Sequence, residues 1–161
     1  DVWAAYRNNL FNQWVDCLQM QDPDQNLKSI FMLLDIADKA GFVSEILLLK
    51  GFNDWTILHQ VAYFGDIGEL DHILAVAQRC GVRRTLVQSV DAAHGLSALQ
   101  CVLDSDRAYA REKWRILVKA MLDDLGYCAL KTIQARDRTG ILERAALLAE
   151  GGVICAGRRH D

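Results

Sequence analysis

The stretch TILHQVAYFG, residues 56–65, decides the fold. A short helix through its apolar residues is expected to end at Gly65, because glycine adopts the backbone conformations that terminate a helix. Asn53 or Asp54 is a candidate N-cap, and Thr56 is also placed to cap the helix start. His59 lies one turn further on, where its ring can hydrogen-bond across the connecting loop.

The same pattern returns further along the chain. GLSALQ at residues 95–100 and TGILERAA at residues 139–146 each place a short helix after a loop. With the leucines as markers, Leu99 follows Leu58 by 41 residues, and Leu142 follows Leu99 by 43. A weaker copy at 34–41 is followed by the stretch EILLL at 45–49, which resembles a second helix. Each unit is therefore predicted to contain a short helix, a turn, a longer helix and a long connection.

The rest of the chain is also predicted to be helical. Apolar residues recur every three or four positions, and no segment alternates apolar and polar residues long enough to indicate a strand. Helix starts are expected at Asp22-Pro23 and Asp106, and helix ends at Gly41 and Gly81. The other expected helices span residues 2–20, 23–40, 42–50, 67–80, 82–90, 97–103, 106–125 and 140–150. The predicted fold class is all-α.

Composition limits the classes of protein. The 161 residues are 52% hydrophobic, with one proline and a net charge of −3. The high apolar fraction excludes a disordered chain, and the length suits one compact domain. The negative charge gives no electrostatic basis for nucleic-acid binding. The longest apolar runs are far shorter than the roughly twenty residues that cross a bilayer. We therefore expect neither nucleic acid nor membrane as a partner.

The residue types that carry catalysis or bind metals form no recognisable motif. The cysteines at 17, 80, 101, 128 and 155 are widely spaced and include no CxxC pair, which favours free thiols in a reducing compartment. Zinc needs three or four converging ligands, and the glycines at 151–152 are not followed by the lysine of a phosphate loop. We expect no metal, no cofactor and no enzymatic activity.

One stretch resembles a known family. Residues 56–65 resemble the T-P-L-H-x-A-A-x-x-G motif of the ankyrin repeat, except at the proline and one alanine. Residues 95–100 and 133–146 resemble weaker copies, and the units exceed the family's period of about 33 residues. The resemblance implies a helical-hairpin solenoid of about three to four divergent ankyrin-like repeats. It also implies structural roles for Thr56, His59 and Gly65.

An N-terminal helix is expected to cap this stack. Residues 1–25 are assigned to the cap, and residues 26–161 to the repeats, of which the last is incomplete. The apolar face of the cap would cover the exposed side of the first repeat. It contains residues at helical spacing, namely Trp3, Tyr6, Leu10, Trp14 and Leu18.

The resemblance implies that loop tips and short helices line a concave surface for a protein partner. The candidate partner-binding residues are Trp55, Gln60, Tyr63, His94, Gln100, Arg136, Arg138 and Arg144. For Trp55, packing against the neighbouring repeat is an equal alternative. The helix expected at 106–125 has a basic side. It contains a stripe of Arg111, Arg115 and Lys119, together with Lys113. This basic side is either a solvated face or a contact for an acidic partner.

These features together favour a protein–protein interaction module. Divergent repeats of this kind resemble those appended to larger proteins, including bacterial effectors that act in host cells. We therefore expect part of a larger protein, monomeric and cytoplasmic, or in the host cytoplasm if the parent is an effector. Two alternatives remain: a helical non-catalytic domain that completes a larger enzyme, and a homodimer that uses the apolar first helix as its interface.

Overall fold

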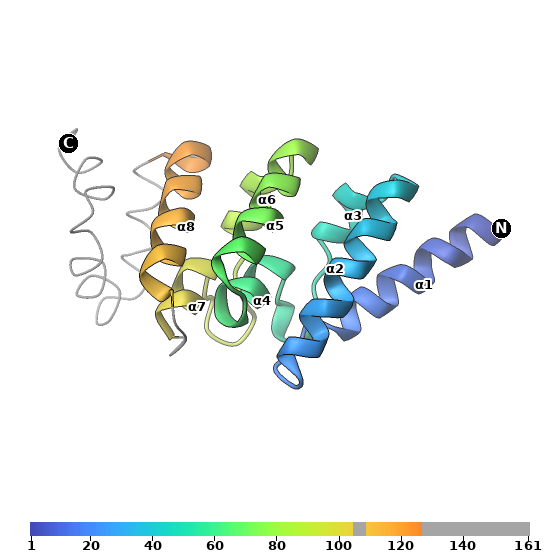
Figure 1. The fold of residues 1–161 in the computed structure, drawn as a ribbon, viewed down its shortest axis with the longest axis horizontal. Helices are drawn as coiled ribbons and strands as arrows, with labels where there is room; N and C mark the ends of the chain where they lie inside the picture. The colour runs from blue at the N-terminus through green and yellow to red at the C-terminus, as the bar shows by residue number, and fades with distance from the viewer. Residues whose placement is uncertain (105–108, 127–161) are drawn as a thin grey trace.

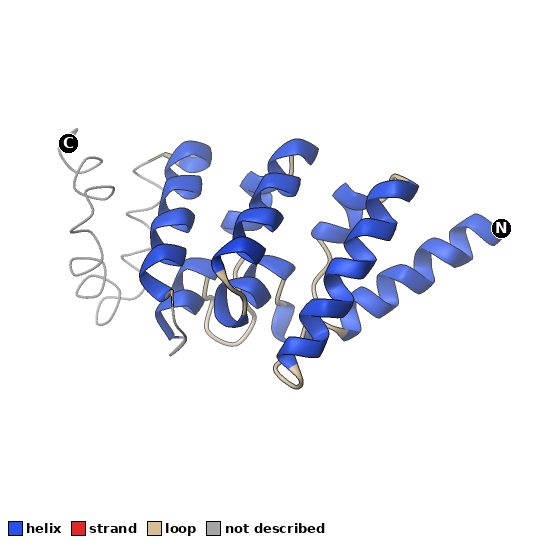
Figure 2. Ribbon diagram, viewed as in Figure 1, coloured by secondary structure: helices blue, strands red, loops and turns tan. Residues whose placement is uncertain are grey.

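The structure is a computed structural model in which residues 1–104 and 109–126 are described. Within these residues the regular elements are helices, and the only β-type pairing is an isolated antiparallel bridge between Val90 and Ser97 (Figure 2). The all-α class is therefore confirmed for the described part. The elements are α1 (Val2–Asp16), α2 (Pro23–Ala40), α3 (Val43–Leu47), the 3-10 helix η1 (Phe52–Asp54), α4 (Ile57–Phe64), α5 (Ile67–Cys80), α6 (Arg83–Gln88), α7 (Ala98–Asp104) and α8 (Ala110–Leu125).

The helices lie in a row along the long axis of the molecule (Figure 1). The long helices α2, α5 and α8 succeed one another along this row, and the shorter helices pack against them. The short helices α4 and α7 pack closely against each other. One continuous core runs through the row and includes the fully buried Trp14, Leu58, Leu99 and Trp114. The expected helix at 140–150 and the marker Leu142 lie outside the described residues.

The ends of α2 and α5 are built in the same way. Gly41 and Gly81 both have left-handed backbones, with φ of 85° and 77°. The residue after each glycine donates its backbone N–H to the carbonyl five positions earlier, at 2.8 and 2.9 Å. This pattern satisfies carbonyls that a helix end leaves without partners. Both predicted helix ends are confirmed, and each is followed by one of the short helices α3 and α6.

Only the second half of α1 packs as its sequence predicted. Leu10 and Trp14 are buried, as is Leu18 just beyond the helix, whereas Trp3 and Tyr6 are 54% and 42% exposed. The helix ends at Asp16 rather than at residue 20. The N-terminal turns of α1 project beyond the rest of the row (Figure 1), so they have little to pack against.

Two predicted helix starts need correction. Asp22 has a left-handed backbone and makes no side-chain cap bond, although the proline that follows does begin α2. Asn53 and Asp54 also have left-handed backbones and belong to η1, so α4 begins only after Thr56. The residue before α8 is Tyr109, and the predicted cap Asp106 lies outside the described residues. A left-handed turn without a side-chain cap therefore precedes α2, whereas α4 begins at a capping box formed by Thr56 and His59.

Candidate functional site

Thr56 and His59 join the start of α4 to the following loop. The Thr56 backbone N–H donates to His59 Nδ1 at 3.1 Å. The other ring nitrogen, Nε2, lies 2.9 Å from the carbonyl oxygen of Leu96, which is 37 residues away in the sequence. A carbonyl only accepts hydrogen bonds, so Nε2 must carry the proton and Nδ1 must accept. The geometry therefore assigns the Nε2–H tautomer to His59.

The environment of His59 keeps its ring neutral. The side chain is fully buried, and this burial lowers the pKa of His59 because it disfavours the charged imidazolium. The hydrogen bond to Leu96 opposes this effect but does not reverse it. A neutral histidine with both nitrogens engaged is a structural link between two segments of backbone.

The start of α7 repeats this arrangement with different side chains. Ser97 precedes α7, and its backbone N–H donates to Oε1 of Gln100 at 2.8 Å. Gln100 is the third residue of α7, just as His59 is the third residue of α4. In both helices the third side chain therefore satisfies the backbone N–H of the preceding cap residue.

The turns in front of α4 and α7 are hydrogen-bonded to each other. Asn53 accepts from the backbone N–H of Ala93 through its side chain, at 2.8 Å, and from that of Ala92 through its carbonyl, at 2.9 Å. Its left-handed backbone, with φ of 59°, is one that asparagine tolerates better than most residues. The turn at 51–55 and the loop at 90–97 are thus held as one surface.

The loop at 90–97 is also fixed internally. The buried Asp91 accepts through Oδ1 from the backbone N–H groups of His94 and Leu96, at 2.9 and 3.1 Å. Its own backbone N–H donates to the Leu96 carbonyl at 2.8 Å. A turn with its backbone groups satisfied in this way loses little conformational entropy when a partner binds.

An aromatic cluster lies beside these two turns. The Trp55 ring stacks near the His59 ring, with centroids 6.0 Å apart and an interplanar angle of 16°. Tyr63 lies 5.8 Å from the Trp55 ring and forms an edge contact with Phe64 at 4.8 Å. Trp55 is only 7% exposed, so it does pack inside the protein. Tyr63 is half-buried.

A pocket of about 190 Å³ opens between the aromatic cluster and the loops. Trp55, Tyr63 and Leu96 line it together with Phe52 and Met20, whose side chains are 73% and 47% exposed. We call the surface formed by these five residues the loop face. Its two exposed apolar side chains, from η1 and from the segment after α1, were not among the residues selected from the sequence. No sequence signal distinguished them, because their exposure depends on how distant turns meet.

The predicted partner-binding residues are distributed unevenly. Trp55 and Tyr63 are brought together on the loop face, and His94 is exposed on the adjacent loop. Gln60 and Gln100 are buried, which corrects their assignment to a binding surface. Gln60 Nε2 donates to the carbonyl of Gln19 at 2.9 Å, so it links α4 to the segment after α1. Arg136, Arg138 and Arg144 lie outside the described residues.

The basic side of α8 also needs correction at Lys113. Its side chain is fully buried, and Nζ donates to the carbonyls of Ala62 and Gly65 at 2.8 and 2.9 Å. These carbonyls belong to the end of α4, where backbone acceptors lack helical partners. Position 113 is one turn before the buried Leu117, so helical spacing alone placed it on the buried face.

The described residues offer little for metal or redox chemistry. They contain no group of three or more histidine, cysteine or acidic side chains that could hold a metal ion. Cys17 and Cys80 carry free thiols. Burial, and to a lesser degree the nearby Asp16 carboxylate, raises the pKa of Cys17, which reduces its thiolate fraction and hence its nucleophilicity.

Two further findings bear on function. No helix in the described part of the chain is both long enough and apolar enough to span a bilayer. Comparisons with protein-family models, with curated proteins and with solved structures found no match to this chain.

Proposed function

We propose that this chain is a protein-recognition module made of divergent ankyrin-like helical hairpins, and that its loop face holds a partner protein. The observation that carries the proposal is the loop-face pocket, where exposed apolar side chains adjoin a buried aromatic cluster on hydrogen-bonded turns. Aromatic and large apolar residues supply most of the binding energy at protein interfaces. The pocket has the size of one or two side chains of a partner.

The matched hairpins support the ankyrin-like part of the proposal. The cap bond at Thr56 has its counterpart at Ser97, and His59 reaches the loop of the next unit. In repeat proteins each unit is stabilised mainly by its neighbours, which leaves the loops as a rigid and extended surface. We place the module in a reducing compartment such as the cytoplasm, because Cys17 and Cys80 carry free thiols.

The loop face can be tested through its two exposed apolar residues. Proteins retained by the immobilised chain would be identified, and the dissociation constant of the tightest one measured with purified components. Replacing Phe52 and Met20 by serine should weaken that complex at least tenfold, which corresponds to about 1.4 kcal/mol. Both side chains are largely exposed, so the melting temperature should change little.

A matched control is available on another surface. Met32 is also an exposed methionine, but it lies on α2 and does not line the loop-face pocket. Met32→Ser should leave the loop-face complex unchanged. Equal affinity for the Phe52→Ser/Met20→Ser variant and the unaltered chain would refute binding at the loop face, and turnover of a substrate by the chain would contradict a purely recognition role.

A second candidate function is supported by the exposed end of α1. Val2, Trp3 and Tyr6 leave apolar surface at the end of the helical row. Such a surface suits a helical domain that completes a larger enzyme or pairs with a second copy through α1. Light scattering tests whether two copies pair through α1. A dimer that dissociates after Trp3→Ser would favour α1 as an interface between copies, whereas a monomer would contradict pairing through α1.

A further inference from the structure

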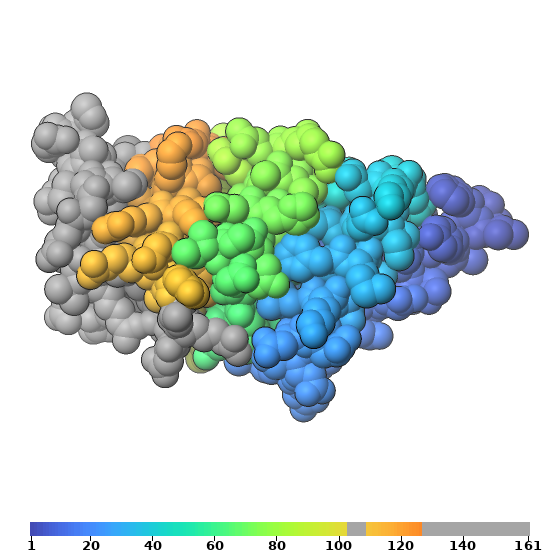
Figure 3. Space-filling model, in the orientation of Figure 1, coloured from blue at the N-terminus to red at the C-terminus, as the bar shows by residue number. Residues whose placement is uncertain are grey.

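A groove runs between α2 and α5, apart from the loop face. One part has a volume of about 940 Å³ and extends from Lys28 to Asp35 on α2 and from Asp66 to His72 on α5. A smaller part of about 350 Å³ continues along the same two helices. The far end is bounded by the ion pair of Arg79 with Asp38, at 3.1 Å. Figure 3 shows the face of the molecule on which α2 and α5 meet.

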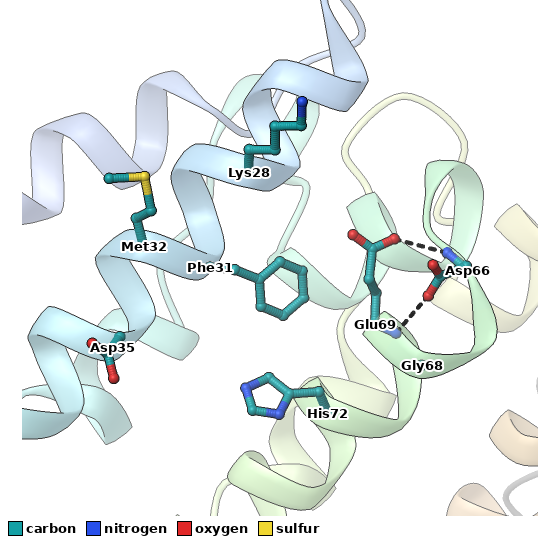
Figure 4. Close-up of a pocket in the computed structure, with 8 residues that line it drawn as sticks. All are labelled: Lys28, Phe31, Met32, Asp35, Asp66, Gly68, Glu69 and His72. Carbon is teal, nitrogen blue, oxygen red and sulfur yellow. Dashed lines mark hydrogen bonds between the residues drawn. The ribbon is translucent and has the colours of Figure 1, made fainter.

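The groove is unusually open compared with the next one along the row. Between α5 and α8 the pocket measures only about 260 Å³, and its lining combines aliphatic residues such as Ile116 and Ala120 with charged ones such as Asp71 and Arg83. Between α2 and α5, by contrast, the Phe31 and His72 rings meet with their centroids 5.5 Å apart. Figure 4 shows these two rings facing each other from opposite helices. An aromatic pair therefore lies between α2 and α5.

The floor of the groove is apolar. Phe31 is half-buried against α5, and Met32 beside it is 68% exposed. These side chains come from one face of α2, one turn before Asp35 and one turn after Lys28. An exposed methionine next to an aromatic ring is a surface that adapts to apolar side chains of a partner.

The rim of the groove is acidic. Four carboxylates line its two parts, against the two cations Lys28 and Arg79, and these carboxylates are Asp35, Asp38, Asp66 and Glu69. Asp66 and Glu69 form a capping box at the start of α5, with bonds of 2.7 and 2.9 Å to each other's backbone N–H groups (Figure 4), so their carboxylates are held in place. Asp35 also pairs with Lys39 at 3.0 Å, but this pair is exposed and weak. The groove thus combines an apolar floor with a negative potential.

We propose that this groove binds an amphipathic helical segment of a partner protein, with its apolar residues on Phe31 and Met32 and its lysine or arginine residues against the acidic rim. Two helices with lining residues one turn apart form the kind of channel that accepts a third helix. The 14 residues of α5 span about 21 Å, which matches a segment of four turns. Charge complementarity selects a basic segment over an acidic one.

The proposal can be tested with a displayed library of random 16-residue peptides. The library would be selected on the full chain, and the enriched peptides synthesised and titrated by fluorescence anisotropy. The enriched sequences should carry apolar residues three or four positions apart together with an excess of lysine and arginine. Met32→Ser should weaken their binding at least tenfold, whereas Met20→Ser on the loop face should leave it unchanged. Enrichment of acidic peptides, or of none whose affinity falls with Met32→Ser, would overturn the proposal.

The acidic rim has its own variant. Asp35→Asn combined with Glu69→Gln removes two negative charges, while glutamine preserves the capping-box acceptor. Binding of the selected peptides should weaken severalfold at low salt, and the difference from the unaltered chain should shrink as salt is added. An unchanged affinity would refute the electrostatic part of the proposal.

A second copy of the chain is the other possible occupant. Light scattering should report a monomer for the unaltered chain. A dimer that Met32→Ser dissociates would assign the groove to self-association and overturn the peptide proposal. A failure of partner binding at the loop face would leave the groove proposal standing, because Met20→Ser and Met32→Ser report on separate surfaces.

Discussion

His59→Ala should destabilise the protein far more than a single surface change. The substitution leaves the buried Thr56 N–H without its acceptor and removes the His59 donor from the Leu96 carbonyl, which keeps its bond from the Asp91 N–H. An unsatisfied buried group costs about 1–3 kcal/mol. The lost ring also leaves a void beside Trp55, which it contacts. We expect a loss of about 3–4 kcal/mol in the free energy of unfolding, a large part of the stability of an average domain.

His59→Gln should cost much less, because Gln100 already performs half of the task in α7. There, Oε1 of Gln100 accepts from the cap N–H of Ser97 at 2.8 Å. A glutamine at 59 can accept from Thr56 in the same way but loses the link to Leu96. We therefore expect a loss of about 1–2 kcal/mol, the size of one partly buried hydrogen bond.

Urea unfolding followed by circular dichroism measures these differences. The slope with denaturant should stay constant across the variants, so that midpoint shifts report stability. His94→Ala is the matched control, since this histidine is exposed and should change stability by less than about 0.5 kcal/mol. Equal losses for the alanine and glutamine variants at 59, or a loss near that of His94→Ala, would refute the role assigned to His59.

Three other predictions follow from buried or crowded positions. Burial lowers the pKa of His59, so this residue contributes fully to stability above its unfolded pKa of about 6.5. The contribution falls as the pH drops from there toward the folded pKa. Urea midpoints between about pH 8 and 5 should show this fall, and in His59→Gln the midpoints should depend less on pH. Lys113→Met should cost about 2–3 kcal/mol in thermal unfolding, because the carbonyls at the end of α4 lose their donor; an unchanged melting temperature would contradict this. Gly51→Ala should destabilise the protein by at least about 2 kcal/mol, since its methyl group would lie 2.7 Å from the Leu18 carbonyl oxygen. Gly41→Ala meets no atom and should cost only about 1 kcal/mol for its left-handed backbone. A larger loss for Gly41→Ala than for Gly51→Ala in chemical unfolding would contradict crowding at Gly51.

Much of the helical framework could be predicted because its signals are local. The ends of α2 and α5 at Gly41 and Gly81 depend on backbone conformations that glycine adopts at little cost. The range of α5 was predicted correctly, since its apolar residues repeat at helical spacing between an acidic cap and a glycine. The parallel between Leu58 and Leu99 also holds in the structure, because both are fully buried in short helices that pack together.

The errors come from residues whose surroundings are set by distant parts of the chain. Gln60, Gln100 and Lys113 are polar, so their sequence suggested a surface. Each is buried because backbone groups needed a hydrogen-bond partner inside the protein. Exposure on the loop face and in the α2–α5 groove was equally hidden. It depends on how turns and helices far apart in sequence meet in space. No local pattern in a single sequence indicates which distant segments will meet.

The bond between His59 and Leu96 tests most directly whether neighbouring hairpins are joined in register. Nitrogen-15 spectra of the imidazole rings report the tautomer of each histidine. We predict that His59 is neutral at pH 7, with its proton on Nε2 and a through-bond coupling from that nitrogen to the Leu96 carbonyl. A protonated ring, a proton on Nδ1, or a ring proton that exchanges freely with solvent would contradict the bond between His59 and Leu96.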